Sequence, residues 1–126
     1  MSRFLLLALV GALHLPLSAV AQTASKPVPP AVAANYLKKP NTVLLDVRTP
    51  AEFASGHLQG AQNIDFRAPG FSDKISKLDK SKTYLLYCAS GNRSGQTTVL
   101  MEETGFKKVV NIGAFEELKQ GGLKAE

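Results

Sequence analysis

Two continuous apolar runs constrain the fold of this chain more than any other feature of its sequence. The first covers residues 42–47 (TVLLDV) and the second covers residues 83–87 (TYLLY). Neither run alternates between apolar and polar side chains, so each predicts a strand that is buried on both faces. Strands of that kind belong to parallel sheets covered by helices. The two runs therefore predict an α/β domain.

Helical segments separate the strands along the chain. A first helix is expected over residues 31–38, and its inner face is expected to carry Val32, Tyr36 and Leu37. Strands that alternate with helices are joined by right-handed crossovers, which place helices on both faces of a mostly parallel sheet. Further helices are expected at 50–54, at 72–78 with Ser72 as the cap, at 93–104 with a stop at Gly105, and at 114–119, and further strands at 63–64 and 109–112.

The first 21 residues have the pattern of a secretory signal peptide. An apolar run covers residues 4–13, and Ala19 and Ala21 supply the small side chains that a signal peptidase requires. An uncleaved membrane anchor is the alternative, but the run is shorter than the roughly 20 residues that span a bilayer. We therefore expect cleavage after Ala21 and a periplasmic or secreted protein. The expected organisation is a signal peptide at 1–21, a flexible lead-in at 22–30, one folded domain at 31–122 and a tail at 123–126.

The distribution of charge limits the partners. The 126 residues include 15 Lys+Arg and 10 Asp+Glu, a formal net charge of +5. The lysines stand singly or in pairs, without the basic runs and interleaved aromatic residues of a nucleic-acid surface. Nucleic acid is therefore not an expected partner, and neither is a membrane once the leader is removed. A positive field of this kind favours a small anionic substrate.

The single cysteine, Cys88, directly follows the second apolar run. One thiol cannot form an intramolecular disulfide, a Cys-x-x-Cys pair or a multi-cysteine zinc site, and we expect neither a metal nor a cofactor. A lone cysteine is often only a buried hydrophobe at the end of a strand. In an oxidising compartment, however, an unpaired thiol is a liability unless the protein uses it. Cys88 is therefore the predicted catalytic nucleophile.

The residues after Cys88 have the composition of an anion-binding loop. Small side chains and a glycine allow a tight curve, in which successive backbone N–H groups point at one spot at the start of a helix. Such a site lowers the pKa of a cysteine from about 8.5 to roughly 3.5–7.5. Arg93 adds a positive charge with a planar fork of donors, and Ser94 adds a hydroxyl. The predicted substrate-binding loop consists of Ala89, Ser90, Gly91, Asn92, Arg93 and Ser94.

Several motifs resemble the single-domain rhodanese family of sulfurtransferases. They are residues 44–53 (LLDVRTPAEF), 56–64 (GHLQGAQNI), 88–94 (CASGNRS), and Gly105-Phe106 followed by residues 110–112 (VNI), in the family's order. The resemblance covers about residues 31–122 and implies the rhodanese-like three-layer fold. The chain departs from the family by having no Trp, and by Gly113-Ala114 where Gly-Gly is common before the last helix.

The resemblance also implies a reaction. Cys88 would carry a persulfide that accepts a sulfane sulfur from a thiosulfate-like donor and passes it to cyanide or another thiol. The loop from Cys88 to Arg93 has six residues, which is the length in sulfur-transferring members, whereas related phosphatases have one more. Two alternatives stay open: a cysteine phosphatase or arsenate reductase, and a non-catalytic module that binds persulfide sulfur or a partner.

Five other polar residues are candidates for supporting roles. Asp46 ends the first strand at the same sheet edge as the predicted nucleophile, and it is expected to accept backbone N–H bonds from the active loop. Arg48 and Glu52 are four residues apart and are expected to pair, so that structural roles are favoured for all three. Arg67 is a candidate for contact with an anionic donor, with a solvated surface arginine as the equal alternative. His57 suggests a Cys–His dyad, but the family resemblance marks its turn as structural.

Overall fold

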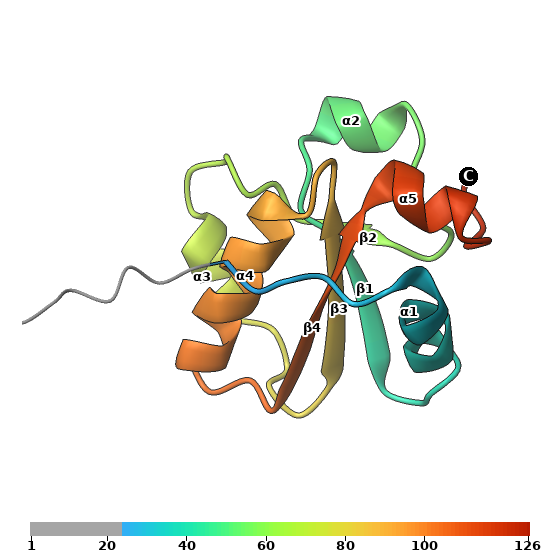
Figure 1. The fold of residues 1–126 in the computed structure, drawn as a ribbon. Coiled ribbons are helices and arrows are strands. Elements are labelled where there is room, and N and C mark those ends of the chain that lie inside the picture. The colour runs from blue at the N-terminus through green and yellow to red at the C-terminus, as the bar shows by residue number, and fades with distance from the viewer. Residues whose placement is uncertain (1–23) are drawn as a thin grey trace, which may run out of the picture.

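The computed structural model describes residues 24–126, which form a four-stranded parallel sheet with helices on both faces (Figure 1). The predicted signal peptide lies outside the described residues. The spatial order of the strands is β2-β1-β3-β4, so the two long apolar runs lie side by side in the centre. The strands are β1 (Thr42–Asp46), β2 (Gln62–Asn63), β3 (Thr83–Cys88) and β4 (Lys108–Ala114).

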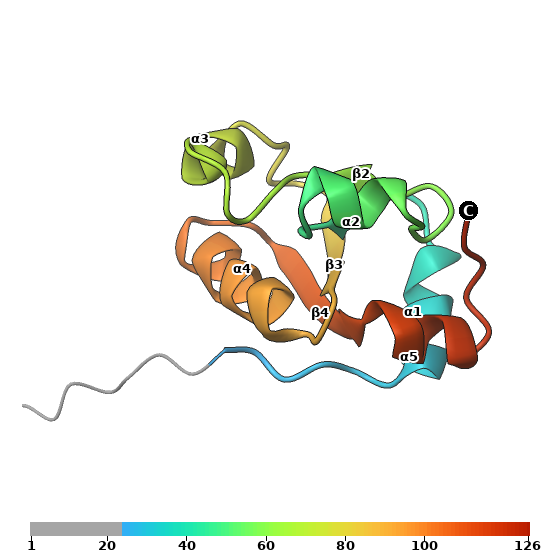
Figure 2. The same cartoon turned by 90° about the horizontal axis from the view of Figure 1, so that it is seen from above.

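Helices cover both faces of the sheet, as Figure 2 shows, and a hydrophobic cluster lies on each face. The helices α3 (Phe71–Ser76) and α4 (Asn92–Glu103) pack on one face, and α1 (Pro30–Leu37) and α5 (Phe115–Gln120) pack on the other. Alternate side chains of the central strands enter opposite clusters, as the period of a strand requires. The short helix α2 (Pro50–Ala54) follows the carboxyl end of β1. The predicted three-layer α/β fold is confirmed.

The inner face of α1 differs in part from the prediction, because Tyr36 packs against the hydrophobic cluster as expected but the other two residues do not. Val32 and Leu37 are both 38% exposed, whereas Ala33 is fully buried against the sheet. The small side chain of Ala33 permits a close approach of the short helix to the sheet, and this close contact determines which face is buried. Apolar character alone was therefore a poor guide to the orientation of α1.

The start of α3 also differs from the prediction. Its N-cap is Gly70, which adopts a left-handed conformation with φ of 77° and makes no side-chain capping bond. Ser72 lies inside the helix and is exposed, so the expectation that it caps the helix was wrong. The chain reverses at Gly70 because glycine tolerates a positive φ. By contrast, α4 ends before Gly105, at φ of 94°, as predicted.

Both ends of the described chain are bound to the domain. We call residues 24–28 the N-terminal strap, because this extended segment lies against α4 and β4, with hydrogen bonds to Gly95 and Asn111. The flexible lead-in expected at 22–30 is thus attached from residue 24 onward. The expected tail pairs with the turn after α2, where the backbones of His57 and Glu126 exchange two hydrogen bonds of 2.9 and 2.8 Å.

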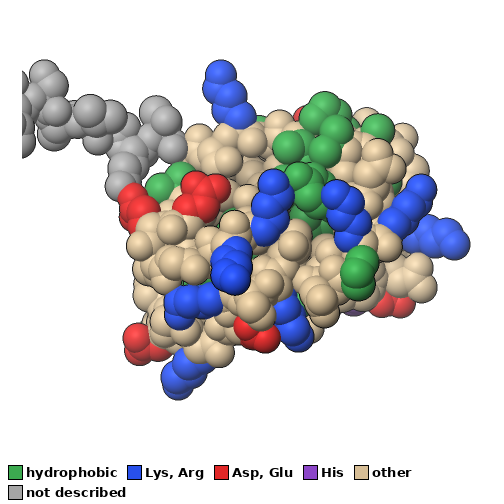
Figure 3. All heavy atoms as spheres, turned by 90° about the horizontal axis from the view of Figure 1, so that it is seen from below, with side chains coloured by type: hydrophobic (Ala, Val, Ile, Leu, Met, Phe, Trp, Pro, Cys, Tyr) green, Lys and Arg blue, Asp and Glu red, His purple; other side chains and the backbone are tan. Residues whose placement is uncertain are grey.

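Lysine side chains gather at the amino-terminal edge of the sheet, which Figure 3 shows from below. They come from three loops that lead into β1, β3 and β4, and a parallel sheet brings these loops together. The sequence separates these residues widely, so their grouping is a product of the fold. The exposed lysines in these loops and at the start of β4 are Lys38, Lys39, Lys77, Lys80, Lys82, Lys107 and Lys108.

No helix among residues 24–126 is long and apolar enough to cross a membrane.

Candidate active site

The thiol of Cys88 lies at the carboxyl end of β3, fully buried beneath the loop that leads into α4. The backbone N–H of Gly91 donates to Sγ at 3.0 Å, and the N–H of Ser94 approaches at 3.5 Å. The Ser94 hydroxyl also lies 3.5 Å from Sγ. The loop therefore surrounds the sulfur with hydrogen-bond donors, as the sequence predicted for an anion-binding loop.

These donors determine the acidity of the thiol. Burial by itself raises the pKa of Cys88, since the charged form loses water. Hydrogen bonds from the Ser94 side chain and from the backbone of Ser94, Ser90 and Gly91 lower it, and together they hold the pKa of Cys88 below its ordinary value. The twelve-residue helix α4 begins at Asn92, so its positive end also favours the thiolate. The loop therefore favours the thiolate form of Cys88.

The conformation of the loop depends on Gly91. This residue is the N-cap of α4 and has φ of 88°, a region that other residues rarely adopt. Gly91 and Ser94 are buried, whereas Ala89, Ser90 and Asn92 are exposed at the surface of the loop. The left-handed turn directs the N–H of Gly91 back to the sulfur.

Arg93 makes a bidentate ion pair with Glu52 of α2. The two nitrogen-to-oxygen distances are 2.8 and 3.0 Å. Glu52 is held in place by a capping box with Thr49 at the start of α2. The hydrogen bonds from Arg93 are the main cause that lowers the pKa of Glu52 to about 2, with further bonds from Thr49 and with burial opposing the shift. The expected pair of Arg48 and Glu52 was wrong, because Arg93, distant in sequence, occupies that carboxylate.

Asp46 and Arg48 form a separate buried ion pair. Arg48 Nη2 lies 2.7 Å from Asp46 Oδ2, and the backbone N–H of Arg48 donates to the same carboxylate at 2.9 Å. The guanidinium also donates to the carbonyl of Gly56 at 2.7 Å and lies 4.3 Å from the ring centre of Phe115. The expected bonds from Asp46 to the active loop are replaced by these bonds to Arg48. The pair stabilises the segment after β1 against α5, which is the structural role that the sequence favoured.

His57 and Arg67 lie in other surroundings. The His57 ring stacks on Phe53 at 3.7 Å between centres, and its Nδ1 is 2.9 Å from the Phe53 carbonyl. Its Nε2 lies 3.6 Å from the carboxylate of Glu126. Both ring nitrogens are therefore engaged by groups outside the active loop, which argues against the Cys–His dyad. Arg67 is exposed, and its backbone N–H donates to Asp65 at 2.9 Å.

Sequence reasoning missed the contacts of two residues with the active loop. One is Glu52, which was expected to pair with Arg48 and instead pairs with Arg93. The other is Asn111 of β4, whose Oδ1 accepts a hydrogen bond of 2.8 Å from the Ser94 hydroxyl. A signal was present for Asn111, because a polar residue within the apolar strand sequence VVNI must be hydrogen-bonded when buried. The identity of its partner depends on tertiary structure.

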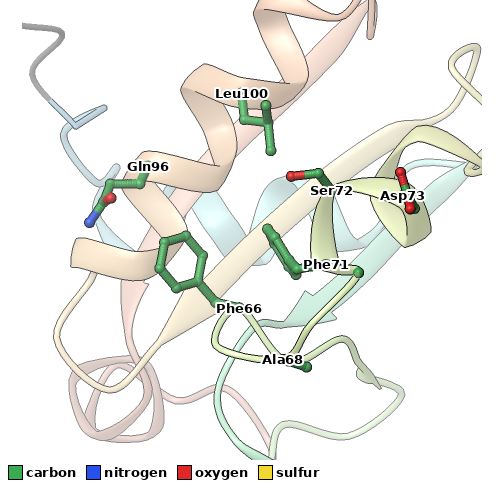
Figure 4. A pocket seen from close by; sticks show the side chains of 8 residues that line it. Phe66, Ala68, Phe71, Ser72, Asp73, Gln96 and Leu100 are labelled. Carbon is green, nitrogen blue, oxygen red and sulfur yellow. The ribbon is translucent and has the colours of Figure 1, made fainter.

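A cavity of about 520 Å³ lies between α3 and α4, beside the loop (Figure 4). Phe66, Phe71 and Leu100 form its apolar wall, and they belong to the same hydrophobic cluster as Cys88. Gln96 lies at its edge and donates to Asn92 of the loop. The residues 24–126 contain no cluster of three or more His, Cys, Asp or Glu side chains that could hold a metal. The remaining lining residues are Ala68, Gly70, Ser72 and Asp73.

Comparisons with known proteins agree with the fold and the loop. The model of the rhodanese-like domain matches residues 29–120. The thiosulfate sulfurtransferase GlpE of Pseudomonas putida is 34% identical over 101 residues, which are 80% of this chain and 90% of GlpE. The thiosulfate sulfurtransferase PspE of Escherichia coli is 31% identical over 80 residues, 64% of this chain and 77% of PspE.

Solved structures give the same result. The crystal structure of Alr3790 from Anabaena has a TM-score of 0.68 at 26% identity, over 79% of this chain and 90% of that one. An E. coli rhodanese determined with anions has a TM-score of 0.57 at 28% identity, over 68% and 96% of the two chains. The chain therefore belongs to the rhodanese-like domain family. It is an enzyme of the sulfurtransferase type.

Proposed function

We propose that the protein transfers a sulfane sulfur from a thiosulfate-like donor to a thiophilic acceptor through a persulfide on Cys88. The observation that supports this proposal most directly is the pair of backbone N–H groups, from Gly91 and Ser94, that donate to Sγ. Such an arrangement stabilises a thiolate before the reaction and an anionic persulfide after it. The names of GlpE and PspE as thiosulfate sulfurtransferases support the same donor.

The proposed reaction has two displacements. The Cys88 thiolate attacks the outer sulfur of thiosulfate, the S–S bond of the donor breaks, and its electron pair leaves with sulfite. The new persulfide carries the negative charge on its terminal sulfur. A cyanide ion or a thiolate then attacks that sulfur, and the electron pair of the Cys–S bond to it returns to Cys88. No external oxidant or reductant is required.

Arg93 supplies a positive charge next to this reaction, although Glu52 already pairs with it. The pKa of Arg93 is raised above its ordinary value, mainly by the hydrogen bonds to Glu52, with a further contribution from the charge of Cys88. The guanidinium is thus within the electrostatic influence of the sulfur. We infer that Glu52 orients Arg93, and that the guanidinium and the loop amides together offset the repulsion between donor and thiolate.

The loop length argues against a phosphatase or arsenate reductase. The loop from Cys88 to Arg93 has only six residues, and the thiol of Cys88 is fully buried beneath it. A non-catalytic module that binds persulfide sulfur is the third hypothesis, and turnover of thiosulfate with cyanide distinguishes it from the first. An aryl phosphate assay distinguishes the phosphatase.

Intact-protein mass spectrometry tests the persulfide directly. After incubation with thiosulfate, the wild type should gain the mass of one sulfur atom, and cyanide should remove it. Cys88→Ser is the blank and should gain nothing. A gain of one sulfur atom by Cys88→Ser would contradict the proposed mechanism.

We also propose that the protein is exported and acts in the periplasm or outside the cell. The support is the apolar run at residues 4–13 with Ala19 and Ala21 at the predicted cleavage site. Amino-terminal mass analysis of the native protein should find Gln22 as the first residue. An intact Met1 in the exported fraction would contradict the prediction.

A further inference from the structure

The N-terminal strap is bound to both elements that support the active loop. The backbone N–H of Ser25 donates to the carbonyl of Gly95 in α4 at 3.2 Å, and the N–H of Val28 donates to the carbonyl of Asn111 in β4 at 3.0 Å. A Cβ added at Gly95 would lie 2.7 Å from the carbonyl oxygen of Ser25, so the strap passes over α4 in direct contact with its backbone.

Asn111 connects the strap to the active loop through its side-chain amide. Its Oδ1 accepts hydrogen bonds from the Ser94 hydroxyl at 2.8 Å and from the N–H of Gly113 at 3.1 Å. Its Nδ2 donates to the carbonyl of Ser25 at 2.6 Å and to that of Gly91 at 3.1 Å. The side-chain amide is buried and makes all four of its hydrogen bonds. The positions of its oxygen and nitrogen are fixed, because Nδ2 faces two carbonyl oxygens that can only accept.

We propose that the N-terminal strap is a working part of the active site, which positions Asn111 so that Asn111 in turn positions the Gly91 and Ser94 groups around the Cys88 thiol. The strap acts at a distance from the sulfur, so Asn111 and Ser25 are positioning residues. The proposal rests on the proposed function only in taking Cys88 as the reacting group.

The contacts explain how the strap would influence the sulfur. The carbonyl of Ser25 is the strap's acceptor for Nδ2, and without it a buried N–H would lose a partner. The amide would then be free to turn, and the hydroxyl of Ser94 and the carbonyl of Gly91 would lose their fixed positions. Both Gly91 and Ser94 also donate backbone N–H groups to Sγ. Release of the strap should therefore weaken the bonds that favour the thiolate.

The rate of Cys88 alkylation by iodoacetamide, measured against pH in the full chain, tests the proposal without any sulfur transfer. Ser25→Pro removes the N–H that donates to Gly95, and it should lower the rate at pH 7 by about three- to tenfold, because the thiol pKa rises and less thiolate is present. Ser25→Ala keeps both backbone groups and is the matched control, which should react as the wild type does. Asn111→Ala should lower the rate at least as much as Ser25→Pro.

The double variant decides whether the strap acts through Asn111. If it does, Ser25→Pro should add almost nothing in the Asn111→Ala background, because coupled residues are not additive. The proposal would be overturned if the alkylation rate of Ser25→Pro followed the wild-type pH profile. It would also be overturned if the effects of the two substitutions on that rate were fully additive in the double variant. If Asn111→Ala fails to fold, judged by circular dichroism, Ser25→Pro against Ser25→Ala still decides it. Absence of the persulfide from the wild type would contradict the proposed function and leave this result unaffected.

Discussion

The two edges of the sheet differ in how they carry charge. At the amino-terminal edge, seven exposed lysines from three neighbouring loops and the start of β4 gather on one surface (Figure 3). At the carboxyl-terminal edge, where Cys88 lies, two arginines are paired with carboxylates, Arg48 with Asp46 and Arg93 with Glu52, and Arg67 in the loop after β2 is exposed. These exposed lysines therefore lie at the end of the sheet opposite Cys88.

The distance between the edges limits the influence of the lysines. Thr83 and Cys88 are the ends of β3, and at about 3.3 Å per residue they are about 17 Å apart. That exceeds the Debye length of about 8 Å at physiological ionic strength. The sulfur is instead in direct contact with the N–H groups of Gly91 and Ser94. The comparison teaches that local dipoles, rather than net charge, create the anion-binding character of this site.

The largest effect is expected from the removal of Arg93. Arg93→Ala should lower the rate of persulfide formation by about 10²–10³, because the positive charge that offsets the repulsion between donor and thiolate is lost and the Glu52 carboxylate loses its partner. His57→Ala should change this rate much less, since the His57 ring contacts Phe53 and Glu126. Stopped-flow measurement of sulfite release would check both. A larger effect of His57→Ala would reinstate the Cys–His dyad.

An intermediate effect is expected at Glu52, with a specific dependence on pH. The pKa of Glu52 is lowered to about 2 in the folded state from an ordinary value of 4.5. Its stabilising contribution is therefore complete above about pH 4.5 and is lost as the pH falls through about 2. Thermal unfolding should show wild type more stable than Glu52→Gln at pH 7 and pH 5, by the same margin, and the margin should narrow towards pH 2. A margin that already disappears at pH 5 would contradict the low pKa.

The smallest effect is expected from the amino-terminal edge. Replacement of Lys38, Lys39, Lys107 and Lys108 by Gln should change kcat/KM for thiosulfate by less than about twofold at physiological ionic strength. The measurement is the thiosulfate–cyanide assay at several salt concentrations. A tenfold lower kcat/KM in the variant at low salt, with the wild type falling to the same value at high salt, would show that the lysine edge does guide the donor to the sulfur.

Local sequence by itself determined the class of fold and indicated Cys88 as the candidate reacting residue. Two doubly buried strands require a parallel sheet, and such a sheet places its functional loops at the carboxyl ends of its strands. Cys88 followed by small residues and a helix start was therefore enough to predict the anion-binding loop. These features depend on patterns within a few residues, which is why they are readable without a structure.

Only the tertiary structure decided which side chains support that loop. Arg93 pairs with a carboxylate 41 positions away, and Asn111 joins the strap at Ser25 to the loop across 86 positions. Glu52 had two arginines as candidate partners, and Asp46 takes Arg48 and leaves Glu52 to Arg93. A hydrogen bond depends on distance and direction in space, and neither is contained in the local pattern of the chain. The sequence therefore indicated Cys88 as the candidate nucleophile, and the fold selected the residues that hold its loop.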